Sequence, residues 1–187
     1  MGADAQITQL LRKAESGDQE SLSEVFQTLY PELRRLAAAR LRGAGHTITP
    51  TVLVHELYLR LGEGKGLSLQ NRRHFFAAAA KAMRWIMVDH ARKRGAEKRG
   101  GGMVAVTLTE RLAEMPEEEE VLALHESLDV LDRLDPRRRE LVELRYFIGL
   151  EFSEVAELLG CSERTAKREW ARARALLHAM LSEHRQD

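Results

Sequence analysis

The stretch Ser153-Glu-Val-Ala-Glu-Leu-Leu-Gly-Cys-Ser-Glu-Arg-Thr-Ala-Lys-Arg-Glu-Trp-Ala-Arg-Ala-Arg-Ala-Leu-Leu177 predicts two helices joined by a tight turn. We expect Ser153 to cap the first helix, because a serine hydroxyl accepts hydrogen bonds from the unpaired amides of a first turn. Gly160 stands where that helix must end, at a position that favours positive φ. Ser162 is placed to cap a second, longer helix. Together these features predict a helix-turn-helix.

The second helix of this motif has an apolar side and a basic side. The apolar side consists of Ala166, Trp170, Ala173 and Leu177. The opposite side consists of Arg164, Lys167, Arg168 and Arg172. A plain helical hairpin with a solvated basic face would have similar charges. The small Ala156, the glycine turn and the early position of the basic residues favour DNA binding instead.

The composition is that of a helical globular protein. Of the 187 residues, 44% are hydrophobic, 31% are charged and 5% are aromatic, with Leu and Ala predominant. This balance favours an all-α fold. The single Cys161 excludes an internal disulfide, no apolar run reaches the ~20 residues that span a bilayer, and the N-terminus has no signal-peptide pattern. We therefore expect a cytoplasmic protein.

Charge is strongly segregated, although the formal net charge is zero. Residues 72–99 contain nine Lys or Arg and two acids, and residues 162–178 contain five Lys or Arg and two acids. Residues 109–135, between them, contain ten acids and two Arg. The basic segments favour contact with polyanions, whereas the acidic segment should stay away from DNA.

Apolar residues at helical spacing predict a series of helices in the N-terminal part of the chain. Gly17 should end the first helix, and Asp18 should cap the second. We expect a third helix to begin at Pro31, because proline suits the first helical position. Thr49 and Pro50 should begin the next helix, over residues 52–61, in the same way.

Residues 71–99 contain the longer basic stretch. Its apolar stripe is Phe76, Ala79, Met83, Ile86, Met87 and His90. We expect Arg73, Lys81, Arg84 and Arg92 to lie elsewhere on the surface. Trp85 is off the stripe, and its position is equally consistent with core packing and with stacking on a nucleic-acid base, worth about 1–3 kcal/mol per base.

The composition divides the chain into two small helical domains, residues 1–95 and 121–187. Three glycines at 100–102, Pro116 and four acids at 117–120 predict a flexible acidic linker over residues 96–120. In the second domain, Asp135 and Pro136 should begin a helix that precedes the helix-turn-helix. The helix before it has the stripe Val121, Leu124, Leu128 and Leu131.

No catalytic, metal or cofactor site is predicted. His55-Glu56 begins like a zinc-protease helix, but Leu59 or Arg60 stands where the second His is needed. The glycines of residues 62–66 lack the Lys-Ser or Lys-Thr of a phosphate loop. We therefore expect a protein that is not an enzyme.

Taken in order, these motifs resemble those of bacterial RNA polymerase sigma factors of the sigma-70 family, specifically the extracytoplasmic-function (ECF) subfamily. The resemblance covers residues 7–94 and 121–181. It rests on Gly17-Asp18 followed by Tyr30-Pro31, on the helix Leu53-Val54-His55-Glu56-Leu57-Tyr58-Leu59-Arg60, on the basic segment 75–94 and on residues 135–177. The chain departs from the family pattern at Val52, Ala78 and Trp85.

The resemblance implies a protein that binds core RNA polymerase and directs sequence-specific promoter recognition and transcription initiation. The implied polymerase-binding residues are Leu53, Val54, His55, Glu56, Leu57, Tyr58 and Arg60. The implied contacts to the minus-ten promoter element, including its melted strand, are Asn71, Arg72, Arg73, His74, Lys81, Arg84, Trp85 and Arg92. The implied contacts to the minus-thirty-five element are Arg164, Thr165, Lys167, Arg168, Arg172 and Arg174. The sequence leaves open whether an anti-sigma protein is a further partner.

Two other functions remain open from the residues alone. A stand-alone helix-turn-helix regulator would bind DNA without polymerase, usually as a dimer on paired half-sites. The basic segment in the N-terminal domain disfavours it. A metal-dependent hydrolase of nucleic acid would need clustered carboxylates near that segment, where only Asp89 and Glu97 occur.

Overall fold

The computed structural model describes residues 3–41, 48–63, 69–97 and 118–183. Within these ranges the chain is almost wholly helical and contains no strand, which confirms the predicted all-α fold class. The elements are α1 (Ala3–Glu15), α2 (Gln19–Arg40), α3 (Pro50–Glu63), α4 (Arg72–Glu97), α5 (Glu118–Leu134), α6 (Pro136–Glu143), the π-helical segment η1 (Leu144–Ile148), α7 (Phe152–Leu159) and α8 (Glu163–Glu183).

Most of the predicted helix starts are confirmed by their caps. The Asp18 carboxylate accepts hydrogen bonds from the amide of Glu20 at 3.1 Å and the hydroxyl of Ser21 at 2.7 Å. These bonds, the one from the Ser21 hydroxyl foremost, lower the pKa of Asp18. Thr49 Oγ1 accepts from the Val52 amide at the start of α3, at 3.3 Å. Each polar side chain satisfies an amide that has no partner within its helix.

The prediction that a third helix begins at Pro31 is wrong, because α2 continues through this residue. Proline within a helix leaves the carbonyl four residues earlier, that of Gln27, without its helical donor. Pro31 and Gln27 both lie on the exposed side of α2, where water can reach that carbonyl. The buried side chains keep the same helical spacing before and after Pro31. They are Leu22, Val25, Phe26, Leu29, Leu33, Leu36 and Ala37. Burial of this stripe therefore overrides the local break.

The helix-turn-helix is confirmed, with one correction to its first cap. Helix α7 begins at Phe152, so Ser153 lies inside the first turn and is not the cap. Glu151 occupies the cap position, and the Glu154 carboxylate accepts from its amide at 2.6 Å. Gly160 ends α7 with φ 62° and ψ 43°. Ser162 caps α8 as predicted, since its hydroxyl accepts from the Thr165 amide at 3.1 Å.

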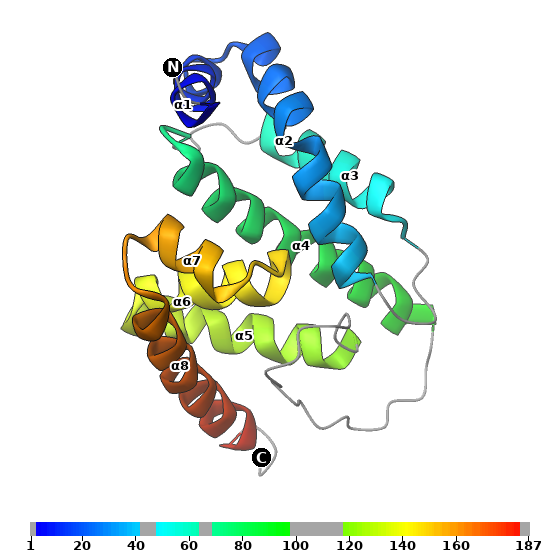
Figure 1. Ribbon diagram of the computed structural model, residues 1–187. Coiled ribbons are helices and arrows are strands. Elements are labelled where there is room, and N and C mark those ends of the chain that lie inside the picture. The colour runs from blue at the N-terminus through cyan, green and yellow to red at the C-terminus, as the bar shows by residue number, and fades with distance from the viewer. Residues whose placement is uncertain (1–2, 42–47, 64–68, 98–117, 184–187) are drawn as a thin grey trace.

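Helix α4 lies at the centre of the molecule, between two groups of helices (Figure 1). Helices α1 and α3 pack on one side of it, with α2 packed against both of them, and α5, α6, η1 and α7 pack on the other. Most of the predicted linker, residues 96–120, is outside the described residues. The described part of the chain nevertheless contains one continuous set of buried apolar side chains. Both the N-terminal half (α1 to α4) and the C-terminal half (α5 to α8) contribute to it.

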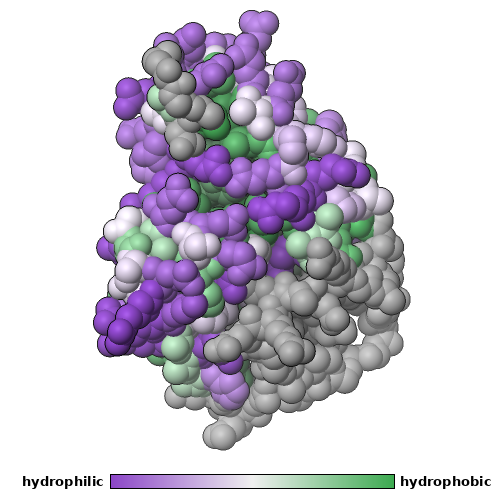
Figure 2. Space-filling model, viewed as in Figure 1, coloured by the Kyte–Doolittle hydropathy of each residue, from purple (hydrophilic) through white to green (hydrophobic). Residues whose placement is uncertain are grey.

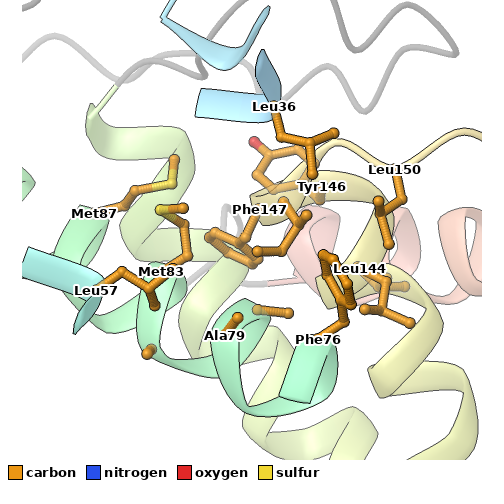
Figure 3. Close-up of a cluster of buried hydrophobic side chains, with 14 of the residues drawn as sticks. Leu36, Leu57, Phe76, Ala79, Met83, Met87, Leu144, Tyr146, Phe147 and Leu150 are labelled. Carbon is orange, nitrogen blue, oxygen red and sulfur yellow. The ribbon is translucent and has the colours of Figure 1, made fainter. Parts of the chain in front are cut away.

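The C-terminal half reaches α4 through a helical segment whose π-helical geometry the sequence patterns did not predict. Asp135 caps α6 by accepting from the Arg138 amide at 2.9 Å, as expected. After Glu143, however, the helix widens into η1, and Gly149 then ends it with φ 85°. A π-helical turn is rare and often occurs at functional sites. Tyr146 and Phe147 of η1 lie among side chains of α2 and α4 (Figure 3).

Candidate nucleic-acid interface

Helix α8 exposes the basic side that the sequence predicts. The side chains of Lys167, Arg168 and Arg172 are 57%, 61% and 58% exposed, and Arg164 is also exposed. The opposite side is buried, with Ala173 and Leu177 fully enclosed and Trp170 3% exposed. Strongly hydrophilic side chains cover the surface around the start of α8 (Figure 2). The helix therefore presents a fixed row of cations to solvent.

The other two predicted minus-thirty-five residues are placed differently. Thr165 is half-buried, and its hydroxyl lies 2.9 Å from that of Ser162, within the cap of the helix. Arg174 is also half-buried. Four of the six residues thus share the exposed basic side, whereas these two are partly enclosed by the rest of the domain.

Glu169 is a residue of this surface that the sequence interpretation missed. Its carboxylate accepts from Arg172 at 2.8 Å and from Arg138 of α6 at 3.0 Å, and it lies 3.5 Å from Arg168 Nε. The pKa of Glu169 is lowered, and the hydrogen bond from Arg138 is the largest cause. The charge of Arg172 lowers it further. The spacing of Glu169 and Arg172 on one helix was a sequence signal for their contact. Glu169 therefore orients cations of the basic side.

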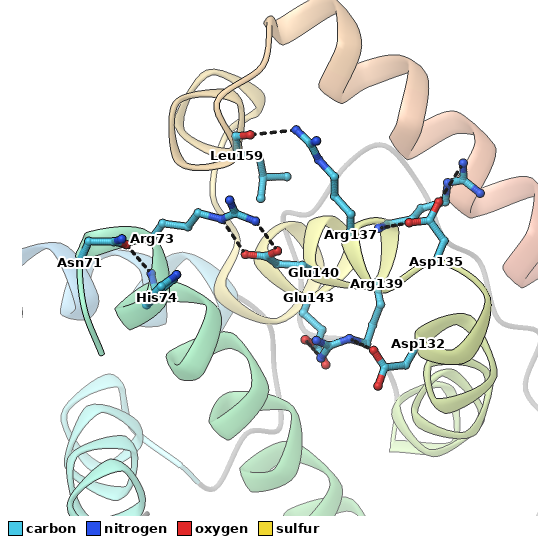
Figure 4. A network of polar contacts seen from close by, with 11 residues as sticks. Asn71, Arg73, His74, Asp132, Asp135, Arg137, Arg139, Glu140, Glu143 and Leu159 are labelled. Atoms are coloured by element: carbon cyan, nitrogen blue, oxygen red, sulfur yellow. Dashed lines mark hydrogen bonds and ion pairs between the residues drawn. The ribbon is translucent and has the colours of Figure 1, made fainter. Parts of the chain in front are cut away.

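The predicted minus-ten residues at the start of α4 are engaged in contacts within the chain. Asn71 caps α4 by accepting from the amide of His74 at 3.0 Å. Arg72 donates to both carboxylate oxygens of Glu32, at 2.7 and 2.8 Å. Arg73 donates to both oxygens of Glu140 in α6, at 3.2 and 3.0 Å (Figure 4). This last hydrogen bonding raises the pKa of Arg73.

Further along α4, the prediction that Arg84 lies on the surface is wrong. Arg84 is 3% exposed, donates to Asp129 of α5 at 3.0 Å, and has its Nε 3.3 Å from Glu143 Oε1. Burial raises the pKa of Glu143, against the opposing charges of Arg139 and Arg84. Lys81 and Arg92 are exposed, as predicted. The basic residues of α4 are therefore divided between solvent, a contact with α2 and contacts with the C-terminal half.

Trp85 packs against the C-terminal half in this arrangement. Its ring centroid lies 4.6 Å from that of His125 in α5, in an edge-to-face geometry. Burial, and secondly the charge of Arg84, lower the pKa of His125. Of the two uses that the sequence left open for Trp85, the structure shows packing.

Helix α3 buries three of the residues predicted to bind polymerase. Leu53, Val54 and Leu57 are 2%, 2% and 0% exposed, because they form its core-facing side. Tyr58 is half-buried, with its hydroxyl 2.9 Å from that of Ser23. These three residues of the motif therefore pack inside the domain.

The outward side of α3 includes apolar residues that the prediction omitted. Val52 and Leu59 are 46% and 47% exposed, and their spacing of seven residues puts them on one face. His55 is exposed beside them, Arg60 pairs with Asp89 at 2.5 Å, and the half-buried Glu56 lies 3.2 Å from His90 Nε2. We call Val52, His55, Glu56, Leu59 and Arg60 the α3 outer face.

The described residues contain no group of three or more His, Cys, Asp or Glu side chains arranged to hold a metal ion. The pair of Glu56 and His90 has no third potential ligand among them. No helix in the described ranges has the length and apolarity to cross a bilayer.

The chain is similar in sequence to known proteins. The family model of the ECF sigma factors matches residues 4–183. The chain is 26% identical over 167 residues to the ECF RNA polymerase sigma factor BldN of Streptomyces coelicolor, an alignment covering 87% of this chain and 61% of that protein. It is 42% identical over 60 residues to the RNA polymerase sigma factor NccH of Alcaligenes xylosoxydans xylosoxydans, covering 32% of each. The chain thus spans less than two thirds of the length of either relative. No solved structure matches it significantly.

Proposed function

The chain belongs to the ECF sigma factor family, and we propose on that basis that it binds core RNA polymerase and directs sequence-specific promoter recognition and transcription initiation. The observation that carries this proposal is the family match across both halves of the chain, in which α8, the second helix of the helix-turn-helix, exposes a basic side. A second basic segment on α4 fits a protein that addresses two DNA elements at once.

Helix α8 would enter the major groove of the minus-thirty-five element. Arg164, Lys167 and Arg168 are near its N-terminal end, from which a recognition helix reaches base edges. Arg172 and Arg174, further along, would contact phosphates, which position the helix without reading sequence. Thr165 would support this end of the helix through its contact with Ser162.

The N-terminal half would contact polymerase and the minus-ten element. The α3 outer face offers exposed apolar and charged side chains for docking on polymerase, on a helix whose other side is fixed in the core. The basic residues of α4 would follow the backbone of the melted strand, and Trp85 would stack on a base once uncovered. The protein would act in the cytoplasm with no catalytic chemistry of its own, and an anti-sigma protein is a further partner to test.

The deciding experiment is run-off transcription from a genomic promoter library with purified core RNA polymerase, with and without this protein. We expect promoter-specific transcripts only when both are present. Arg168→Ala should lower them roughly tenfold or more, because a good base contact contributes about 1–3 kcal/mol of discrimination. Arg133→Ala removes an exposed arginine outside the helix-turn-helix and should leave them unchanged.

A paired variant tests docking on polymerase. Leu59→Glu should abolish co-purification with core enzyme, whereas Leu134→Glu, at a site 64% exposed on α5, should not. Sequence-specific DNA binding by the protein alone, with no new transcripts from core enzyme, would instead establish a stand-alone regulator.

A further inference from the structure

Glu169 is an acid at the edge of the basic side of α8, next to Arg168 and within one turn of Arg172. Its side chain is 25% exposed. A carboxylate on a surface that faces phosphates lowers the affinity for DNA of any sequence, because it repels the charges that the neighbouring arginines attract. On charge alone, Glu169 therefore opposes DNA binding.

Helix α6 holds one oxygen of this carboxylate. Helices α6 and α8 pack together, and Arg138 of α6 donates to Glu169 Oε2 at 3.0 Å. The Arg138 side chain is 23% exposed, and its Nη2 lies 3.2 Å from Oδ2 of Asp135, the residue that caps α6. The position of Glu169 is therefore fixed by a second helix as well as by α8.

The other oxygen holds two arginines that face solvent. Glu169 Oε1 accepts from Arg172 Nη1 at 2.8 Å and lies 3.5 Å from Arg168 Nε. These arginine side chains are 58% and 61% exposed, and a long exposed side chain otherwise samples many rotamers. One anchored carboxylate thus limits the directions in which two guanidinium groups leave the helix.

A second acid of α8 makes a contact of a different kind. Glu163 Oε1 lies 2.6 Å from Lys167 Nζ, one turn along the same helix, and the Glu163 side chain is 49% exposed. In the described part of the chain, no hydrogen bond or ion pair connects Glu163 with another helix. Glu163 thus pairs with a cation of the basic side without the anchor that Glu169 has.

We propose that Glu169 is a positioning residue that determines the DNA sequence specificity of α8, because it presents Arg168 and Arg172 in one fixed arrangement. Guanidinium groups that are held before binding lose less rotamer freedom on a duplex whose bases and phosphates match that arrangement. On other duplexes they fit poorly, and the carboxylate adds only repulsion. This proposal rests on the proposed function for the identity of the ligand, which is duplex DNA. The fixed arrangement itself is a property of the free chain.

The test is Glu169→Gln in the full chain, with Glu163→Gln as its matched control. Each change removes one negative charge from α8 at nearly constant volume, beside an exposed cation. Only the first removes the charge that connects the arginines to α6. Arg138→Gln tests the anchor separately, because it leaves Glu169 in place. Circular dichroism checks that the variants are folded, and Arg138→Lys replaces Arg138→Gln if the latter unfolds.

The first readout requires no DNA. NMR relaxation of the arginine Nε–Hε groups measures how rigidly each side chain is held on the picosecond-to-nanosecond timescale. We expect Glu169→Gln and Arg138→Gln to lower the order parameters of Arg168 and Arg172, while Glu163→Gln leaves them unchanged. Equal order parameters in the wild type and in Glu169→Gln would overturn the proposal.

The second readout is the ratio of affinities for two duplexes, measured by fluorescence anisotropy with core RNA polymerase present. One duplex is selected by the wild-type chain and core polymerase from a random library, and the other is random in sequence. Both are measured at one salt concentration, because phosphate contacts make the affinity depend on salt.

We expect Glu169→Gln to bind the selected duplex more weakly and the random duplex more tightly than the wild type does. The ratio should fall about tenfold, as for the loss of one good base contact. Arg138→Gln should also lower the ratio, because Glu169 then loses its anchor. Glu163→Gln should bind both duplexes more tightly to the same extent, so that its ratio stays that of the wild type.

Two simpler roles for Glu169 predict other results. A role in stability alone would make Glu169→Gln weaken binding to both duplexes in proportion, and a role as a repelling charge alone would strengthen both. Either result, or an unchanged ratio in Arg138→Gln, would contradict the proposal. A selection that enriches no sequence would contradict it as well. Enrichment of a sequence without run-off transcripts would instead refute the proposed function and leave the positioning role standing.

Discussion

Gly149 and Gly160 have similar left-handed backbone conformations, but only Gly149 faces a side chain from the other half of the molecule. Their φ angles are 85° and 62°. A Cβ added at Gly160 would meet no atom within 4 Å, whereas one added at Gly149 would lie 2.8 Å from Cδ and 3.3 Å from Cγ of Arg40. Arg40 is 2% exposed, so it has little room to move away.

Alanine substitution at the two positions therefore separates backbone strain from contact between the halves. Gly160→Ala should lower the free energy of unfolding by about 1–2 kcal/mol, the cost of a left-handed conformation for an L-residue. Gly149→Ala should cost the same amount plus about 1–3 kcal/mol for overpacking against Arg40. Urea unfolding followed by circular dichroism measures both losses.

A double-mutant cycle with Arg40→Ala identifies the source of the difference. We expect Gly149→Ala to lose most of its additional cost in the Arg40→Ala background, and Gly160→Ala to cost the same in either background. Equal losses for the two glycine variants, with no coupling to Arg40, would refute the packing of η1 against α2.

Two further predictions concern the contact between the halves. Phe147→Ala should lower the free energy of unfolding by about 3–5 kcal/mol and accelerate amide exchange in both α4 and α6. Leu134→Ala, at an exposed site, should change the free energy of unfolding by less than about 0.5 kcal/mol. Acceleration confined to α6 would contradict the contact. Burial raises the pKa of Glu143, so the folded chain keeps this proton at pH values where the unfolded chain has lost it. The contribution of Glu143 to stability is therefore most favourable below its ordinary pKa of 4.5 and falls as the pH rises through the pKa of the folded chain. Glu143→Gln removes that titration, and urea unfolding across this pH range should show the wild type gaining stability relative to Glu143→Gln on acidification, while a constant difference would count against the raised pKa.

The features that the sequence predicted correctly depend on near neighbours in the chain. Asp18, Thr49, Asp135 and Ser162 each bind an amide two or three residues away, so the cap is visible in the local pattern. Gly160 is equally local, because the turn itself requires its backbone conformation. The order of these signals was sufficient to identify the helix-turn-helix.

The incorrect predictions each required knowledge of packing. Pro31 is a local signal for a helix start, but the apolar stripe of α2 continues past it. The residues of the stripe are buried both before and after Pro31 in the sequence. Ser153 is a plausible cap in the sequence, but in the structure Glu151 occupies the cap position and its amide donates to the Glu154 carboxylate. Arg84 was assigned to the surface because it is charged, and its burial depends on carboxylates from two other helices.

The sequence by itself determined the helical content, the helix-turn-helix and the separation of basic from acidic segments. Helical periodicity, capping and charge are properties of residues within a few positions of one another. Only the tertiary structure decided which cations remain exposed. Arg84 and Asp129 are 45 residues apart in sequence, and Arg73 and Glu140 are 67 apart. No local pattern specifies such pairs, because they form only when burial of Phe147 and its neighbours brings the two halves together on α4.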